Sequence, residues 1–168
     1  MPIDLYIDVG RSVHLRPLLP KAGAVLAEIL GLVSIPQLTL EALENGQRET
    51  VSSDELYNEN SPLFLISIAG EPETVALNKP STRVTVMMAF TRSNLEFALG
   101  AAVAITLARE REAEVIGDDW RFFSDELLIS PEDLLRRLKV VGTANDYQQA
   151  AEQLSGKLGK EGRGDSSD

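Results

Sequence analysis

The stretch that decides the fold is residues 91–111, which read TRSNLEFALGAAVAITLARER. Ser93 and Glu96 form a capping box, in which the serine hydroxyl accepts from the Glu96 N–H and the Glu96 carboxylate reaches back to the Ser93 N–H. Every residue from 97 to 108 is apolar, apart from one glycine and one threonine. A helix that is apolar nearly all round is buried. We therefore expect a central helix that lies across one face of a β-sheet.

This stretch is too short to be a membrane span. A span needs about 20 consecutive apolar residues, whereas this run ends at Ala108 and has charged residues on both sides. Gly100 costs about 1 kcal/mol relative to alanine inside a helix, so we expect another backbone to pass close to it. The sequence thus predicts a core helix and no membrane segment.

Segments on either side of this helix predict the strands of the sheet. Residues 2–9 alternate between apolar and polar, which is typical of a strand with one buried face. Residues 83–90 are apolar on both sides after Thr85, which predicts an interior strand that leads directly into the helix. Further strands or short return arms are predicted at residues 38–42, 47–51, 63–69, 73–79, 114–116 and 120–123.

Three more helices are predicted from apolar spacing and capping residues. Residues 21–32 carry apolar side chains on one helical face, with Pro20 in the first turn. Ser130 followed by Pro131 is a strong start for a helix that runs to about residue 139. Residues 145–158 are a weakly apolar last helix. Residues 11–17 and 52–61 are expected to be irregular, and Asn45-Gly46 is expected to form a tight turn.

The order of these elements predicts an α+β fold. We expect a two-layer sandwich, with a mainly antiparallel sheet and helices on one face. A ferredoxin-like, split β-α-β pattern with an added C-terminal helix is the nearest simple template. The length of 168 residues suits one domain, which we place at residues 1–158. Residues 159–168 are expected to form a disordered polar tail.

Composition excludes several classes of function. The formal net charge of −10 argues against a nucleic-acid binder, which needs clustered lysine and arginine. The absence of cysteine excludes disulfides and thiolate metal sites. The first residues lack the basic and apolar regions of a signal peptide, so we expect a soluble, cytoplasmic protein. Acidic residues crowd residues 41–73, which hold one base, Arg48, and residues 110–133. They form either an ordinary solvated surface or a field that attracts a basic partner.

One candidate binding group follows the predicted strand at residues 114–116. Carboxylates and aromatic rings are close together there, and aromatic residues are enriched in the cores of protein interfaces. The same rings could equally be a lid on a small core. The residues of this group are Asp118, Asp119, Trp120, Phe122 and Phe123.

A second candidate is a pocket near the end of the first predicted strand. His14, the only histidine, lies in the loop that follows this strand, and it could act as a general base. Its expected neighbours are Asp8, Arg11 and Arg16. The alternative is an ordinary surface histidine.

The sequence predicts neither a metal nor a cofactor. The carboxylates near residues 118–119 and 125–126 do not have the spacing of a calcium loop, and Gly117-Asp118-Asp119 is better explained as a turn. The chain contains no glycine-rich phosphate loop, no nucleophile elbow and no zinc-binding pattern. No stretch carries a specific catalytic signature.

Our leading hypothesis is therefore a non-enzymatic protein that binds another protein. An acidic surface suits a basic partner, as in inhibitors of the immunity type that neutralise a basic enzyme. The alternative is a small-molecule-binding protein or enzyme that uses the pocket near His14. A third possibility is a homodimer formed through an open sheet face.

Overall fold

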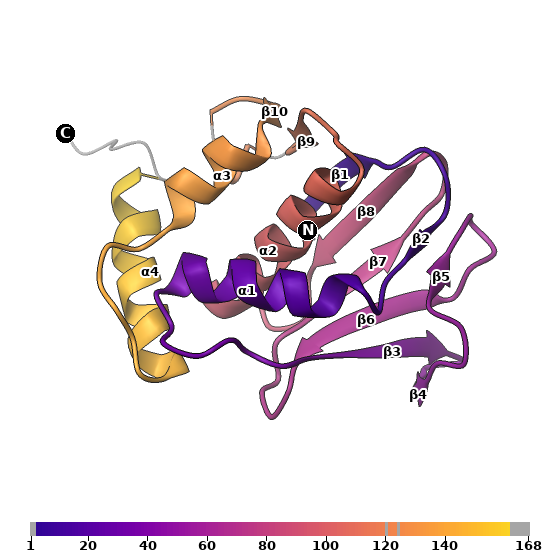
Figure 1. Cartoon of the computed structure of the whole chain (residues 1–168), viewed down its shortest axis with the longest axis horizontal. Coiled ribbons are helices and arrows are strands. Elements are labelled where there is room, and N and C mark those ends of the chain that lie inside the picture. Colours follow the sequence, from indigo (N-terminus) through magenta and orange to yellow (C-terminus); the bar gives the residue numbers. More distant parts are fainter. Residues whose placement is uncertain (1–2, 120, 124, 162–168) are drawn as a thin grey trace.

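The computed structural model describes residues 3–119, 121–123 and 125–161 of the chain. These residues form an α+β fold with an eight-stranded antiparallel sheet, in the order β10-β9-β1-β8-β7-β6-β3-β4, and a separate pair, β2-β5 (Figure 1). The strands are β1 (Ile3–Asp8), β2 (Val13–His14), β3 (Leu38–Glu44), β4 (Gln47–Thr50), β5 (Glu55–Leu56), β6 (Leu63–Ile68), β7 (Thr74–Asn78), β8 (Arg83–Met88), β9 (Ile116–Gly117) and β10 (Leu128–Ile129).

Four helices are present in the described residues: α1 (Leu18–Leu30), α2 (Asn94–Glu110), α3 (Pro131–Leu138) and α4 (Tyr147–Glu161). Helices α1 and α2 lie side by side on one face of the sheet, and α3 and α4 pack together at one end of the molecule (Figure 1). The predicted α+β class and antiparallel sheet are confirmed. Helix α4 extends to Glu161, three residues into the predicted tail, and the rest of that tail lies outside the described residues.

The core lies between the sheet and the two central helices. Strand β1 pairs with β8 in antiparallel register, with Leu5 opposite Val86 and Ile7 opposite Val84. All four side chains are buried, which follows from the period-two pattern of residues 2–9. Strand β8 lies between β1 and β7, so its predicted interior position is also confirmed.

Helix α2 begins with half of the predicted capping box. The Ser93 hydroxyl accepts from the Glu96 N–H at 3.2 Å, as expected. The Glu96 carboxylate instead accepts from the N–H groups of Thr91 and Arg92, at 3.0 and 2.8 Å. The chain turns sharply at Arg92, whose φ is +55°, and the N–H groups of Thr91 and Arg92 both point to the buried carboxylate.

The nearest neighbour of Gly100 is a side chain and not the expected backbone. A Cβ placed on Gly100 would collide with the Sδ and Cγ atoms of Met88 on β8. Met88 is fully buried, so the glycine makes room for a thioether between α2 and the sheet.

The eight-stranded sheet is larger than that of a ferredoxin-like fold. The segments predicted at residues 47–51 and 73–79 both form strands of this sheet, β4 and β7. Strands β9 and β10 extend the sheet at the edge opposite β4. Strand β9 pairs with β1 on one side and with β10 on the other. The predicted return arm at residues 120–123 is not its partner, because the described residues 121–123 are not in a strand. The two regions expected to be irregular each contribute one short strand, β2 and β5, which pair with each other.

The sheet face opposite the helices is curved and partly covered by its own side chains. Arg48 of the edge strand β4 donates to the hydroxyl of Thr74 on β7 at 3.4 Å, although β3 and β6 lie between these strands. Arg48 also lies 3.7 Å from the Glu41 carboxylate. Leu65 of β6 lies on the same outer face as Arg48 and Glu41, and it is fully buried although no helix covers this face. No helix among the described residues combines the length and the apolar character needed to cross a bilayer.

Candidate functional site

The predicted carboxylate and aromatic group is mostly internal to its own loop. Asp118 is buried, and its two carboxylate oxygens accept from the N–H groups of Phe122 and Phe123, at 3.1 and 2.8 Å. The Phe122 ring packs on Phe97 of α2, with 4.6 Å between ring centroids, and on Phe123. Phe123 is buried. These contacts favour a lid on the core over an exposed binding surface.

The other two members of this group are placed differently. Asp119 is exposed and lines a hollow of about 470 Å³ on the outer sheet face. Trp120 lies outside the described residues. Binding of a partner by this group stays a prediction.

His14 lies on β2, opposite Glu55 of β5. Its Nδ1 is 3.0 Å from the Asp54 carboxylate, and its Nε2 is 3.4 Å from the Glu55 carboxylate. The hydrogen bond to Asp54, assisted by both negative charges, raises the pKa of His14 above its usual value. Burial alone would raise the pKa of Asp54, but hydrogen bonds from His14 and from the Arg16 N–H lower it. The two side chains therefore form a charged pair at pH values between the lowered pKa of Asp54 and the raised pKa of His14.

The predicted neighbours of His14 are only partly gathered around it. Arg16 belongs to the cluster through its backbone N–H, which donates to Asp54 at 2.9 Å, while its guanidinium donates to the Val51 carbonyl. Asp8 instead lies opposite Arg83 of β8 and accepts from the Gly10 N–H. Arg11 is exposed, with no contact to His14 recorded among the described residues. The carboxylates that face the imidazole are those of Asp54 and Glu55, which lie about 40 residues away in the sequence and are not indicated by any local pattern.

This arrangement is poorly suited to general base catalysis. A neutral imidazole needs one unprotonated nitrogen that faces the substrate. Both ring nitrogens of His14 face carboxylates, which favour the doubly protonated ring. The side chain is 59% exposed, and it does not line the hollows of about 420, 410, 370 and 470 Å³ that the described residues form.

An acidic hollow lies next to this pair, and its lining includes Glu55, whose carboxylate also faces His14. Its volume is about 410 Å³, and it opens between the β3–β4 hairpin and the segment that follows β4. Glu44, Glu49 and Glu55 contribute carboxylates from three different elements, and Tyr57 contributes a half-exposed ring. The remaining lining residues are Ala42, Thr50, Val51, Ser52, Ser53, Pro62 and Phe64. We call this set of residues the acidic hollow.

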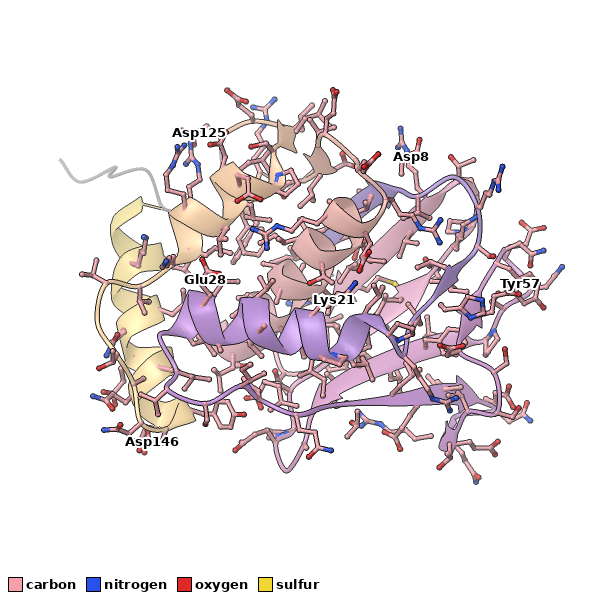
Figure 2. All side chains as sticks on the ribbon, viewed as in Figure 1. Asp8, Lys21, Glu28, Tyr57, Asp125 and Asp146 are labelled. Carbon is pink, nitrogen blue, oxygen red and sulfur yellow. The ribbon has the colours of Figure 1, made fainter. Side chains whose placement is uncertain are left out.

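The lining of the acidic hollow contains no basic side chain among the described residues. The nearby bases are turned elsewhere: Arg48 crosses the outer face to Glu41 and Thr74, and the Arg16 guanidinium bonds to a backbone carbonyl. Glu55 already faces His14 Nε2 at 3.4 Å, whereas Glu44 and Glu49 form no ion pair with another side chain in the described part of the chain and can attract a cation. Tyr57 of the acidic hollow lies at the end of the molecule remote from α4 (Figure 2).

Lys79 holds one wall of the acidic hollow. Its side chain is only 4% exposed, and its ammonium donates to the carbonyls of Tyr57 and Ser81, at 3.1 and 2.8 Å. These bonds tie the segment after β5 to the turn between β7 and β8. The backbone of Tyr57 is therefore fixed by the buried Lys79 side chain, although the Tyr57 ring itself lies in an exposed loop.

A groove of about 420 Å³ between α1 and α2 differs from the acidic hollow in its charge. Lys21 pairs with Glu110, Glu28 pairs with Lys139, and Arg109 makes two hydrogen bonds of 3.0 Å to Glu132. Figure 2 shows Lys21 and Glu28 on the edge of α1 that faces α2 and α3. Because its charges are already paired, this groove has little electrostatic attraction left for a ligand.

No group of three or more histidine, aspartate or glutamate side chains in the described part of the chain is placed to hold a metal ion. No family model, curated protein or solved structure matches this chain. The assignment of function therefore rests on the geometry and charge of the site.

The acidic hollow was missed at the level of residues, although its signal was present. Glu44, Glu49 and Glu55 belong to the acidic run at residues 41–73, which on its own indicates only an acidic surface. The spacing of these residues does not reveal that they converge. Convergence depends on the β3–β4 hairpin and on the pairing of β2 with β5.

Proposed function

We propose that this protein binds a basic segment of another protein at the acidic hollow. The observation that carries the proposal is a concave site with three carboxylates from separate elements and no basic side chain in its described lining. Carboxylates brought together in this way repel each other, and a lysine or arginine side chain would relieve that repulsion. The ring of Tyr57 offers a face for the aliphatic part of the same side chain.

A partner protein suits this site better than a nucleic acid or an anionic metabolite. The carboxylates of the acidic hollow repel phosphate groups, and the net charge of −10 adds to that repulsion at long range. The same field would accelerate the approach of a basic protein. Neutralisation of a basic enzyme, by covering its cationic surface, is one activity that follows from such binding.

The test is a pull-down from a lysate of the source cells with three forms of the full chain. The first is wild type, the second is Glu44→Gln with Glu49→Gln, and the third is Glu114→Gln with Glu152→Gln. The third form is a matched control, because it removes two exposed carboxylates away from the acidic hollow.

We expect wild type and control to retain the same basic protein at low salt. The Glu44/Glu49 form should bind that protein at least about tenfold more weakly, since a hydrogen bond to a charged group contributes about 1.5–3 kcal/mol. Retention should fall as salt rises, because the screening length shrinks to about 3 Å at 1 M salt. Equal retention by all three forms would refute the acidic hollow as the binding site.

A further inference from the structure

We infer that the basic segment binds as an added antiparallel strand along the free edge of β4, with its basic side chains directed into the acidic hollow. This inference rests on the proposed function and specifies how the partner is held. It assigns the backbone of β4, and not only its side chains, to recognition.

Strand β4 has a free backbone edge. It is the last strand in the order of the large sheet, and all four of its residues are exposed. Main-chain groups on such an edge are a template for another strand. Strand addition of this kind is an established mode of peptide recognition, in which backbone hydrogen bonds give affinity and alternate side chains give specificity.

The turn before β4 fixes which of its backbone groups are free. Asn45 and Gly46 both have positive φ, +52° and +77°, as in a two-residue type I′ hairpin. The residues that close such a hairpin, here Glu44 and Gln47, exchange hydrogen bonds, and the pattern then alternates. Arg48 and Thr50 therefore direct their N–H and C=O groups away from β3, toward the free edge.

The same register places the acidic hollow beside alternate residues of an added strand. Glu49 is opposite Ala42, and both line the acidic hollow. A residue opposite Glu49 in the added strand would point its side chain to that face. The residue two positions along would lie opposite Gln47, next to Glu44. The expected ligand thus has two basic residues separated by one other residue.

The residues between the two basic ones face a different surface. On the outer face, Arg48 and Thr50 lie opposite Leu43 and Glu41, and the Arg48 guanidinium already contacts Glu41 and Thr74. A basic residue there would meet a like charge, so a small uncharged residue such as threonine is expected. The resulting pattern, Thr-Lys-Thr-Lys-Thr, is specific to this register.

Neither the other edge nor a second copy of the chain fits as well. Strand β10 at the opposite edge has two residues, and Leu128 there is exposed. A second copy paired on β4 would bring the Glu44 and Glu49 carboxylates of two hairpins together, between molecules that each carry a net charge of −10. A basic strand of another protein therefore fits the free edge of β4 better than a second copy of this chain does.

The experiment uses the full chain and the blocked peptide Thr-Lys-Thr-Lys-Thr, with binding followed by backbone amide NMR. In antiparallel pairing the threonines opposite Arg48 and Thr50 direct their N–H groups at β4, and the lysine N–H groups point away. N-methylation of the threonines should weaken binding at least about tenfold, since each backbone hydrogen bond contributes roughly a factor of five. N-methylation of the lysines should change affinity by less than about threefold, by the same reasoning.

A protein variant provides the reciprocal test. Thr50→Pro removes the outward N–H and leaves the hydrogen bonds between β3 and β4 in place. It should also reduce peptide affinity about fivefold, the factor for one backbone hydrogen bond. Thr50→Val keeps the N–H and should bind like wild type. The amide spectrum of each variant shows whether it is folded.

The outcomes separate this inference from the proposed function. If the unmodified peptide binds, and Glu44→Gln with Glu49→Gln weakens it, while N-methylation of the threonines has no effect, strand addition is wrong and the acidic hollow stands. If the unmodified peptide does not bind at low salt, both proposals fail. If the Arg48 and Thr50 amides become protected with rising protein concentration and no peptide, a second copy occupies the edge and strand addition by a partner is overturned.

Discussion

At the scale of single residues, two glycines in helices should respond to alanine in opposite ways. A Cβ on Gly23 of α1 would lie 2.6 Å from the Pro36 carbonyl oxygen, a backbone atom, whereas a Cβ on Gly156 of α4 would meet nothing within 4 Å. Alanine favours a helix by about 1 kcal/mol over glycine. We expect Gly156→Ala to raise the free energy of unfolding by up to about 1 kcal/mol. Gly23→Ala should lower it by about 1–3 kcal/mol, because the loop must shift.

Denaturation by urea with both variants checks this pair of predictions. Each variant is the other's control, since the chemical change is identical and only the surroundings differ. Stabilisation by Gly23→Ala would show that residues 35–36 do not cross the helix as closely as described.

The pair formed by His14 and Asp54 should make stability depend on pH. The raised pKa of His14 gives a contribution that is complete below its unfolded value near 6.5 and is lost as pH rises through the folded value. The lowered pKa of Asp54 gives a contribution that is complete above 3.8 and is lost as pH falls through its folded value. The pair is therefore fully effective between these limits.

We expect His14→Gln to lower the free energy of unfolding more at pH 5.5 than at pH 9. Denaturant titrations of wild type and variant at both pH values measure this difference. NMR titration of the imidazole provides a check, and Asp54→Asn should move the pKa of His14 back toward its usual value. An equal effect of His14→Gln at both pH values would contradict the pairing.

At the scale of elements, the start of α2 depends on a buried carboxylate. Glu96 is fully buried and accepts from two backbone N–H groups. Glu96→Ala leaves both donors without this partner, so we expect a loss of about 2–4 kcal/mol in the free energy of unfolding. Ser130→Ala at the start of α3, which removes one ordinary cap, should cost only about 1 kcal/mol. Thermal or urea denaturation compares the two, and similar losses would show that Glu96 is an ordinary cap.

Elements with a local signal were predictable, and pairs of distant short strands were not. Ser130 followed by Pro131 marks the start of α3 because a cap and a proline act within one turn. Strands β2 and β5 have two residues each and are joined across about 40 positions, so neither shows a measurable period. The local sequence predicts only that Asp118 is a turn residue. In the structure its carboxylate also accepts hydrogen bonds from the N–H groups of Phe122 and Phe123, which the sequence did not indicate.

At the scale of the whole molecule, the charge at the β3–β4 end should reduce stability in the absence of a partner. Glu44 and Glu49 face the same hollow as Glu55, and like charges held together oppose folding. We expect Glu44→Gln with Glu49→Gln to raise the free energy of unfolding by about 0.5 kcal/mol at low salt. That gain should vanish near 1 M salt, where the screening length is about 3 Å.

The matched variant Glu114→Gln with Glu152→Gln controls for the change in net charge. Urea denaturation of both variants at low and high salt measures the effect. A lower stability of the Glu44/Glu49 variant at low salt would show that these carboxylates are already compensated in the free protein.

The site could be predicted from the sequence only as a property of composition. An excess of acid at residues 41–73 was visible, but the positions that converge are set by the hairpin, by the anchor at Lys79 and by the β2–β5 pair. His14 was visible as a lone histidine, whereas its partners lie about 40 residues away. Residues that are distant in the sequence and meet in the fold leave no periodic pattern or fixed spacing in the sequence. The fold class could therefore be predicted from local patterns, whereas the acidic hollow could not.

The position of β1 within the sheet has a consequence for biosynthesis. Residues 38–88 hold strands β3, β4, β6, β7 and β8, which are neighbours in the sheet and can pair as the chain leaves the ribosome. Strand β1 is made first, yet Ile3 pairs with Met88 and Tyr6 pairs with Gly117. A nascent chain must therefore keep the apolar side chains of β1 unpaired until β8 and β9 have been translated. During that interval residues 3–8 offer a ribosome-associated chaperone an apolar segment, which the folded sheet then encloses between β8 and β9.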